Sequence, residues 1–194
     1  MKDVLGIAAL VALTVVVLVA MRAGWHRRAV SSAAVVPALA AVPADLGTVR
    51  LGPVAATYVS TTVAGDWLDR VVAHDLGVRS AASVSVTDAG VLVARTGARD
   101  LFVPAADLVG AGRAPGMAGK VVGGQGLVVL RWRAPSADGG PRTELETGLR
   151  TRRGADRAPL TQAVDALVTA RSTVNGSTPD ASTPDAATPD EERT

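Results

Sequence analysis

An unbroken run of residues without a charged side chain, residues 4–21, constrains this chain more than any other feature. In a helix that rises about 1.5 Å per residue, the run covers most of a hydrocarbon core that is roughly 30 Å thick. A helix on the surface of a soluble domain would carry polar residues along one face, and this run contains only Thr14. The run therefore predicts one transmembrane helix.

A cleaved signal peptide is the alternative interpretation of the same run. The region before it holds Lys2 next to Asp3, which is a weak positive start, and the residues around Ala20 and Ala23 fit a cleavage site poorly. Positive charge follows the run instead of preceding it. These features favour a retained anchor.

The position of the arginines predicts the orientation of this anchor. Lys2 and the amino terminus precede the run, three arginines follow it, and such cations stay on the cytoplasmic side. The excess of Ala, Val, Gly and Arg is typical of a GC-rich bacterial genome. We therefore expect a single-pass protein of the bacterial plasma membrane, with its C-terminal domain in the cytoplasm. The expected anchors at the lipid interface are Arg22, Trp25, Arg27 and Arg28, although a single tryptophan near a helix end is a weak signal.

The rest of the chain divides into a linker, a folded domain and a tail. After the anchor and its basic flank, residues 1–28, two prolines and many alanines indicate a linker over residues 29–47. Short runs rich in Val and Thr, separated by Gly, Asp and Pro, predict a mainly β domain over residues 48–171. Residues 172–194 repeat Thr-Pro-Asp without a hydrophobic pattern, so we expect a disordered acidic tail.

The β domain is expected to hold about six or seven antiparallel strands. Alternating or apolar runs place these strands at residues 52–62, 83–87, 91–95, 99–103, 108–111, 127–133 and 143–149. Gly-Gly-Gln-Gly at residues 123–126 predicts a hairpin that joins residues 121–122 to the strand at 127–133.

Two helices are expected in the same domain. Residues 64–76 predict a short helix with one apolar face, made of Trp67, Leu68, Val71 and Val72. Residues 158–170 predict an amphipathic helix that closes the end of the sheet, with Asp156 as its cap. Its apolar stripe is Leu160, Val164, Leu167 and Val168.

Several stretches carry a resemblance to a known family. They are YVSTT at residues 58–62, GDWLDR at 65–70, GVRS at 77–80, DLFVP at 100–104, GMAGKVV at 116–122 and ETGLR at 146–150. By these stretches the chain resembles actinobacterial single-pass membrane proteins with a bacterial PH-like domain, which are often labelled transporters or export proteins. The resemblance implies a PH-like β domain that acts as a membrane-tethered adaptor. It supplies no catalytic residues.

The sequence lacks the usual arrangements for catalysis and metal binding. It has no cysteine, which excludes thiol chemistry, and its two histidines, His26 and His74, are far apart. Residues 115–120 (PGMAGK) lack the first glycine and the hydroxyl of a phosphate-binding loop, so we expect a turn there. We therefore expect no enzymatic activity and no cofactor. The net charge of +2 is too small to predict nucleic-acid binding.

The densest basic cluster lies between the last strand and the closing helix. An anionic lipid headgroup or an acidic protein would bind such a cluster, whereas solvation of a loop and pairing with the acidic tail are the alternatives. Trp67 is either a packing residue or a contact for a partner. Asp66 and Asp69 beside it are more typical of a helix cap than of an acid–base pair. The cluster consists of Arg150, Arg152, Arg153 and Arg157.

Two functions follow from these observations. The first is a membrane-tethered interaction or scaffold module, with the lipid bilayer and a protein of unknown identity as partners. The alternative is an accessory subunit of a transport or export system. That alternative requires other membrane subunits, because one span without an intramembrane charge forms no conduction path.

Overall fold

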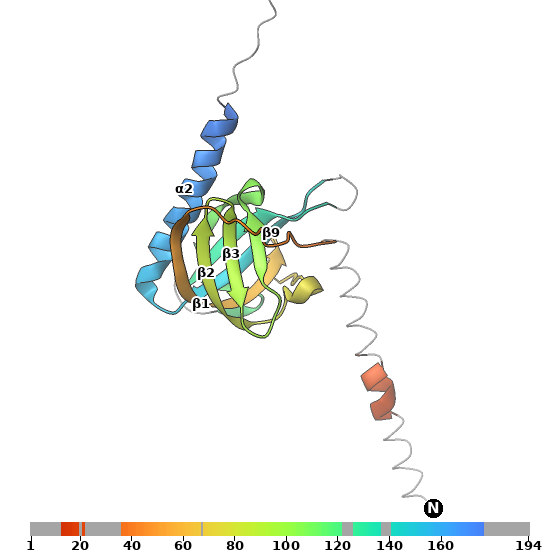
Figure 1. The fold of residues 1–194 in the computed structure, drawn as a ribbon. Helices are drawn as coiled ribbons and strands as arrows, with labels where there is room; N and C mark the ends of the chain where they lie inside the picture. Colours follow the sequence, from red (N-terminus) through yellow and green to blue (C-terminus); the bar gives the residue numbers. More distant parts are fainter. Residues whose placement is uncertain are drawn as a thin grey trace, which may run out of the picture.

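The computed structural model describes residues 13–19, 21, 36–66, 68–121, 126–136 and 141–176. In this part of the chain, seven strands form one antiparallel sheet in the order β4-β3-β2-β1-β9-β8-β5 (Figure 1). These strands are β1 (Val49–Val63), β2 (Ser80–Thr87), β3 (Gly90–Arg95), β4 (Leu101–Pro104), β5 (Leu108–Ala114), β8 (Leu127–Arg133) and β9 (Glu144–Thr151). The other elements are the small hairpin β6 (Gly116–Met117) and β7 (Lys120–Val121), the 3-10 turns η1 (Ala73–Asp75), η2 (Ala105–Asp107) and η3 (Gly154–Asp156), and the helix α2 (Arg157–Gly176).

The sheet encloses one main core. The long strand β1 pairs with both β2 and β9 and so joins the two halves of the sheet. Side chains from both halves, such as Val84 of β2 and Leu130 of β8, belong to one buried cluster. The antiparallel sheet and the C-terminal helix that the sequence predicts are therefore confirmed.

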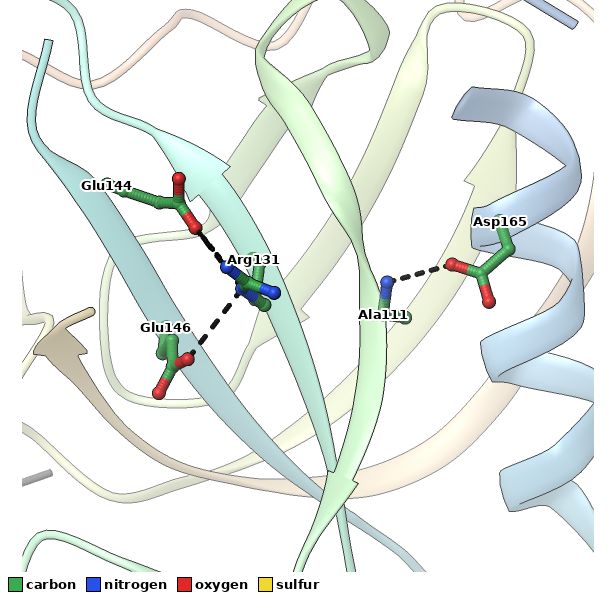
Figure 2. Close-up of polar contacts among 5 residues, drawn as sticks. All are labelled: Ala111, Arg131, Glu144, Glu146 and Asp165. Atoms are coloured by element: carbon green, nitrogen blue, oxygen red, sulfur yellow. Dashed lines mark hydrogen bonds and ion pairs between the residues drawn. The ribbon is translucent and has the colours of Figure 1, made fainter. Parts of the chain in front are cut away.

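Helix α2 closes the sheet at one side (Figure 1). Leu160, Val164 and Leu167 are buried in the main core, as the apolar stripe predicts. Asp165 of α2 also contacts the sheet, because its carboxylate accepts a hydrogen bond from the backbone N–H of Ala111 in β5 at 2.9 Å (Figure 2). The helix thus covers part of an edge strand, and it continues to Gly176, beyond the predicted end.

The short helix predicted over residues 64–76 is wrong. Of the described residues in this range, only those of η1 are helical. Residues 69–71 and Leu76 pair instead with the second half of β1, whose edge is open where β2 ends. Val71 donates its backbone N–H to the carbonyl of Thr61 at 3.0 Å, and Thr61 donates to Leu76 at 2.9 Å. Pairing along β1 satisfies backbone groups that a helix would otherwise satisfy.

The hairpin predicted between residues 121–122 and 127–133 is also wrong. β7 pairs with β6, and β8 pairs with β5 and β9, while residues 122–125 lie outside the described residues. The β6–β7 hairpin lies on the outer face of the sheet, where Met117 packs with Leu127 and Val129 in a second buried cluster. A Cβ atom on Gly148 of β9 would lie 2.8 Å from Met117 Sδ, so a larger residue there would force the Met117 side chain to shift.

Residues 36–47, expected within the linker, pack on the domain without regular secondary structure. Val36 is fully buried in the main core, and Leu39 packs against that core. His74 Nε2 donates a hydrogen bond to the carbonyl of Val36 at 2.8 Å, and Ala89 donates its backbone N–H to Leu46 at 3.1 Å. We call residues 36–47 the strap, which crosses the domain before β1 begins (Figure 1).

The predicted membrane anchor lies mostly outside the described residues. Residues 13–19 and 21 are helical, and their apolar side chains are exposed. Within the described ranges, no helix has the length and the apolar character needed to cross a membrane. The remainder of residues 4–21 lies outside these ranges, as do the predicted interface anchors Arg22, Trp25, Arg27 and Arg28. Of the predicted disordered tail, residues 172–176 are helical in α2, and residues 177–194 lie outside the described residues.

Candidate functional site

The outer face of β9 has an acidic end and a basic end. Alternate residues of a strand point to opposite faces of a sheet. The inner row of β9 is buried and consists of Leu145, Thr147, Leu149 and Thr151. The outer row, which continues one residue past the strand, consists of Glu144, Glu146, Gly148, Arg150 and Arg152.

The acidic end of this row is partly neutralised by a cation from the neighbouring strand. Arg131 of β8 binds Glu144 with 2.7 Å between Nη2 and Oε1, and its Nε lies 3.8 Å from Oε1 of Glu146 (Figure 2). One arginine therefore lies between two carboxylates, and these three groups together carry a net charge of about −1.

The basic end has no such compensation. Arg150 and Arg152 are exposed, and neither guanidinium has a hydrogen-bond or ion-pair partner among the described residues. The neighbouring strand supplies Thr57 opposite Arg150, while Ala55 accepts the backbone N–H of Arg152 at 2.8 Å. Both arginine backbones are thus fixed, and both side chains are free to bind an anion. We call Arg150 and Arg152 the basic end.

A depression of about 420 Å³ lies beside the basic end. It forms because short side chains of β1 and β2 lie next to long arginine side chains of β9. For example, Ala81 of β2 pairs with Thr57 of β1, which pairs with Arg150. We call it the alanine depression, and its lining residues are Ala55, Ala56, Thr57, Ala81, Ala82, Arg150, Thr151 and Arg152.

The other two arginines of the predicted basic cluster do not share this arrangement. Arg153 binds Asp156 with 3.1 Å between Nε and Oδ2, and this hydrogen bond and charge raise the pKa of Arg153. Asp156 therefore pairs with Arg153 rather than capping α2. Arg157 is half-buried at the start of α2, and its Nε is buried without a hydrogen-bond partner. The structure thus brings together two of the four arginines.

The segment around Trp67 provides a turn. Trp67 lies outside the described residues, so its role stays a prediction. Asp66 Oδ1 accepts hydrogen bonds from the backbone N–H groups of Leu68 and Asp69, at 3.0 and 3.1 Å. This is the capping geometry that the sequence predicts, although no α-helix follows it.

The interior contains a series of hydrogen-bonded polar side chains that the sequence does not predict. A bulge in β1 between Tyr58 and Ser60 puts Thr61 on the same inner face as Tyr58. Tyr58 and Thr61 then lie 2.7 Å apart at their oxygens, and Thr61 and Thr147 are also 2.7 Å apart. Trp132 Nε1 donates to Thr147 at 2.9 Å, and Tyr58 donates to the carbonyl of Leu76 at 2.8 Å.

The groups at the two ends of this series fix the direction of every hydrogen bond in it. The indole N–H only donates and a carbonyl only accepts. Trp132 therefore donates to Thr147, Thr147 to Thr61, Thr61 to Tyr58, and Tyr58 to the carbonyl of Leu76. Each hydroxyl and N–H group of this hydrogen-bonded series therefore donates within it, and the series holds strands of the sheet together.

A buried arginine completes the interior. Arg95 is 7% exposed, and its guanidinium lies 3.9 Å from the centre of the Tyr58 ring. Its Nη2 donates to the carbonyls of Asp75 and Val78, at 2.9 and 2.6 Å. Arg95 also donates from Nη1 to the carbonyl of Arg99 and from Nε to the hydroxyl of Ser80. The sequence does carry a signal for the burial of Arg95. Alternate residues of β3 point inward, and position 95 follows the inward positions 91 and 93.

The described residues offer little for metal chemistry. Among them, no group of three or more His, Asp or Glu residues is placed to hold a metal ion. The exposed cations and the alanine depression are suited to binding an anion rather than to acid–base catalysis.

Comparison with known proteins identifies one related group. A family model described as "Bacterial PH domain-like" matches residues 36–165, well over half of the chain. The match begins at the first residue of the strap and includes all seven strands of the sheet. No curated protein and no solved structure matches the chain.

Proposed function

Because the chain belongs to the bacterial PH domain-like family, we propose that it is an interaction module held at the cytoplasmic face of the bacterial plasma membrane. Domains of this fold are generally binding modules rather than enzymes. In this proposal, residues 4–21 anchor the chain in the bilayer, and the basic end binds an anionic partner.

The uncompensated charge of the basic end is the observation that carries the proposal. The nearby carboxylates Glu144, Glu146 and Asp156 already bind other arginines, and the alanine depression has no acidic lining residue. Arg150 and Arg152 are therefore available to a partner. Exposed arginines are frequent anchors of binding surfaces.

The membrane tether is supported by the apolar helical residues near the amino terminus. Their side chains are 52–65% exposed, for example at Leu13 and Met21. A contiguous exposed apolar surface is unfavourable in water and marks a membrane or partner contact. The arginines that follow the run supply the expected orientation.

Localisation is tested with the full chain in a bacterial host. We expect the chain to remain in the membrane fraction after an alkaline carbonate wash. A C-terminal green fluorescent protein should fluoresce, and a C-terminal alkaline phosphatase should be inactive, because the domain faces the cytoplasm. Recovery of a shortened chain outside the cell would contradict the tether.

Partner binding is tested by crosslinking the full-length protein in membranes. We expect the double variant Arg150→Glu/Arg152→Glu to lose its specific crosslinks. A matched variant, Arg113→Glu/Arg133→Glu, reverses the same charge at exposed arginines of β5 and β8 and should keep them. Equal crosslinks in both variants would contradict a binding role for the basic end. A crosslink to a multi-span protein would instead favour the accessory transport role.

A further inference from the structure

The arrangement of the basic end narrows the class of anion that would bind there. Two arginines at alternate positions of one strand have Cα atoms about 6.5–7 Å apart and point to the same side. Each guanidinium presents a planar fork of N–H donors that matches two oxygens of a phosphate or carboxylate. A phosphate group has enough oxygens to accept from both forks at once.

We propose that the alanine depression is a binding site for a phosphate ester, with Arg150 and Arg152 as its charged contacts. This inference rests on the proposed function, since it names the ligand class of the same surface. A phosphate ester is available there either as an anionic lipid headgroup or as a soluble metabolite.

The lining of the depression supports a phosphate ester over a bare phosphate ion. Its volume of about 420 Å³ leaves room for the group that carries the phosphate. Ala55 and Ala81 are exposed and provide small apolar surfaces, and half-buried Thr57 lies between Ala81 and Arg150. Thr151 is 4% exposed and donates its hydroxyl to the carbonyl of Arg153, so it is already occupied.

The charges around the depression favour the same class. None of the lining residues is acidic. Glu146 is the nearest acidic residue of the outer row, and it is separated from Arg150 by Gly148 and lies 3.8 Å from Arg131. Because Arg150 and Arg152 have no counter-ion, a bound phosphate would not have to displace an existing ion pair.

Binding is tested with the full chain in neutral maltoside micelles at low ionic strength, because salt screens exposed charges. The probes are inorganic phosphate, glycerol 3-phosphate, short-chain phosphatidylglycerol and short-chain phosphatidylcholine, titrated by calorimetry. We expect glycerol 3-phosphate or phosphatidylglycerol to bind more tightly than inorganic phosphate. Phosphatidylcholine should bind more weakly than phosphatidylglycerol because its headgroup carries a compensating cation. Binding of glycerol 3-phosphate without phosphatidylglycerol assigns a soluble ester, and binding of the lipid alone assigns a headgroup.

Two variants separate a specific site from general attraction. Arg150→Gln/Arg152→Gln should lower the affinity by about 10-fold for each arginine removed, whereas Arg113→Gln/Arg133→Gln should leave it nearly unchanged. Ala81→Leu keeps the charge but fills the depression, so it should also weaken binding by about 10-fold. Circular dichroism checks that each variant is folded.

The inference would be overturned by any of three results. These are the absence of binding by every phosphate probe, an equal loss in the two arginine double variants, and undiminished binding to a folded Ala81→Leu variant. If probes fail to bind while the crosslinks of the full chain still depend on Arg150 and Arg152, the ligand is an acidic protein surface. In that case the phosphate inference is wrong and the proposed interaction module stands.

Discussion

Tyr58 provides a direct test of the buried interior, because it is the only tyrosine in the chain. Its side chain is fully buried, and its hydroxyl donates to Leu76 and lies 2.7 Å from Thr61. Burial disfavours the charged phenolate and raises the pKa of Tyr58 to about 12, although the hydrogen bond with Thr61 and the charge of Arg95 partly oppose this. The perturbation is therefore a rise in pH.

The sign and size of the effect follow from the two states of the chain. In the unfolded chain tyrosine ionises near pH 10, and in the folded chain near 12. Below pH 10 both states hold the proton, so stability does not depend on this group. Between these values the unfolded state holds fewer protons, so the free energy of unfolding falls as pH rises. The total loss from this group is roughly 3 kcal/mol, from about two pKa units.

The assay is a titration of phenolate absorbance in the folded chain and in concentrated urea. We expect a midpoint near 10 in urea and about two units higher in the folded protein, with circular dichroism confirming that the fold persists. The variant Tyr58→Phe should lose this part of the alkaline destabilisation. A midpoint near 10 in a chain that is still folded would refute the burial argument.

Three further predictions concern stability. Thr147→Val removes the acceptor of the Trp132 indole at nearly constant volume, so urea unfolding should show a loss of about 2 kcal/mol. Gly148→Ala places a Cβ against Met117 Sδ and should cost about 1 kcal/mol by the same assay, with part of the loss recovered when Met117 is also shortened. Arg95→Met leaves buried carbonyls without a donor, so it should cost about 3 kcal/mol and speed hydrogen exchange in the segment between β1 and β2.

Each of these predictions has a clear opposite result. The control Thr57→Val changes a threonine on the outer face and should alter stability little. Equal losses of stability at Thr57 and Thr147 would contradict a stabilising role for the buried hydrogen bonds of Thr147. Additive effects of the Gly148 and Met117 changes would show that the two residues do not meet. Unchanged hydrogen exchange in Arg95→Met would mean that Arg95 does not hold the segment between β1 and β2.

Local patterns in the sequence predict most of the fold. The alternation of Ser83 to Thr87 and the turn after it predict the β2–β3 hairpin, because period-two alternation and turn residues are properties of adjacent positions. The stripe through Leu160 and Leu167 predicts α2 for the same reason. The segment 64–76 is different, since its backbone pairs with β1, and a distant partner leaves no mark on local periodicity.

The candidate site was predicted in part. Four arginines within residues 150–157 indicate a basic cluster, but the sequence predicts it after a strand that ends at residue 149, whereas Arg150 lies within β9. The pairing of Arg153 with Asp156, and the small side chains of β1 and β2 beside the basic end, depend on three-dimensional neighbours. Ser60, Thr61 and Thr62 lie in β1, within the predicted strand at residues 52–62, and all three are buried. Their burial depends on a bulge and on a covering hairpin that composition does not reveal.

Docking of the strap limits how far the domain can travel from its anchor. Val36 is packed in the core, so if residues 4–21 cross the bilayer, the 14 residues of 22–35 separate the lipid from the core. Even fully extended, such a segment reaches only about 50 Å. Ligands on the inner leaflet would then be sampled at an effective concentration on the order of millimolar. A site too weak to be filled in dilute solution would then be occupied in the cell. Replacing Val36 by a charged residue would release the strap, increase the distance that the domain can reach, and lower this effective concentration.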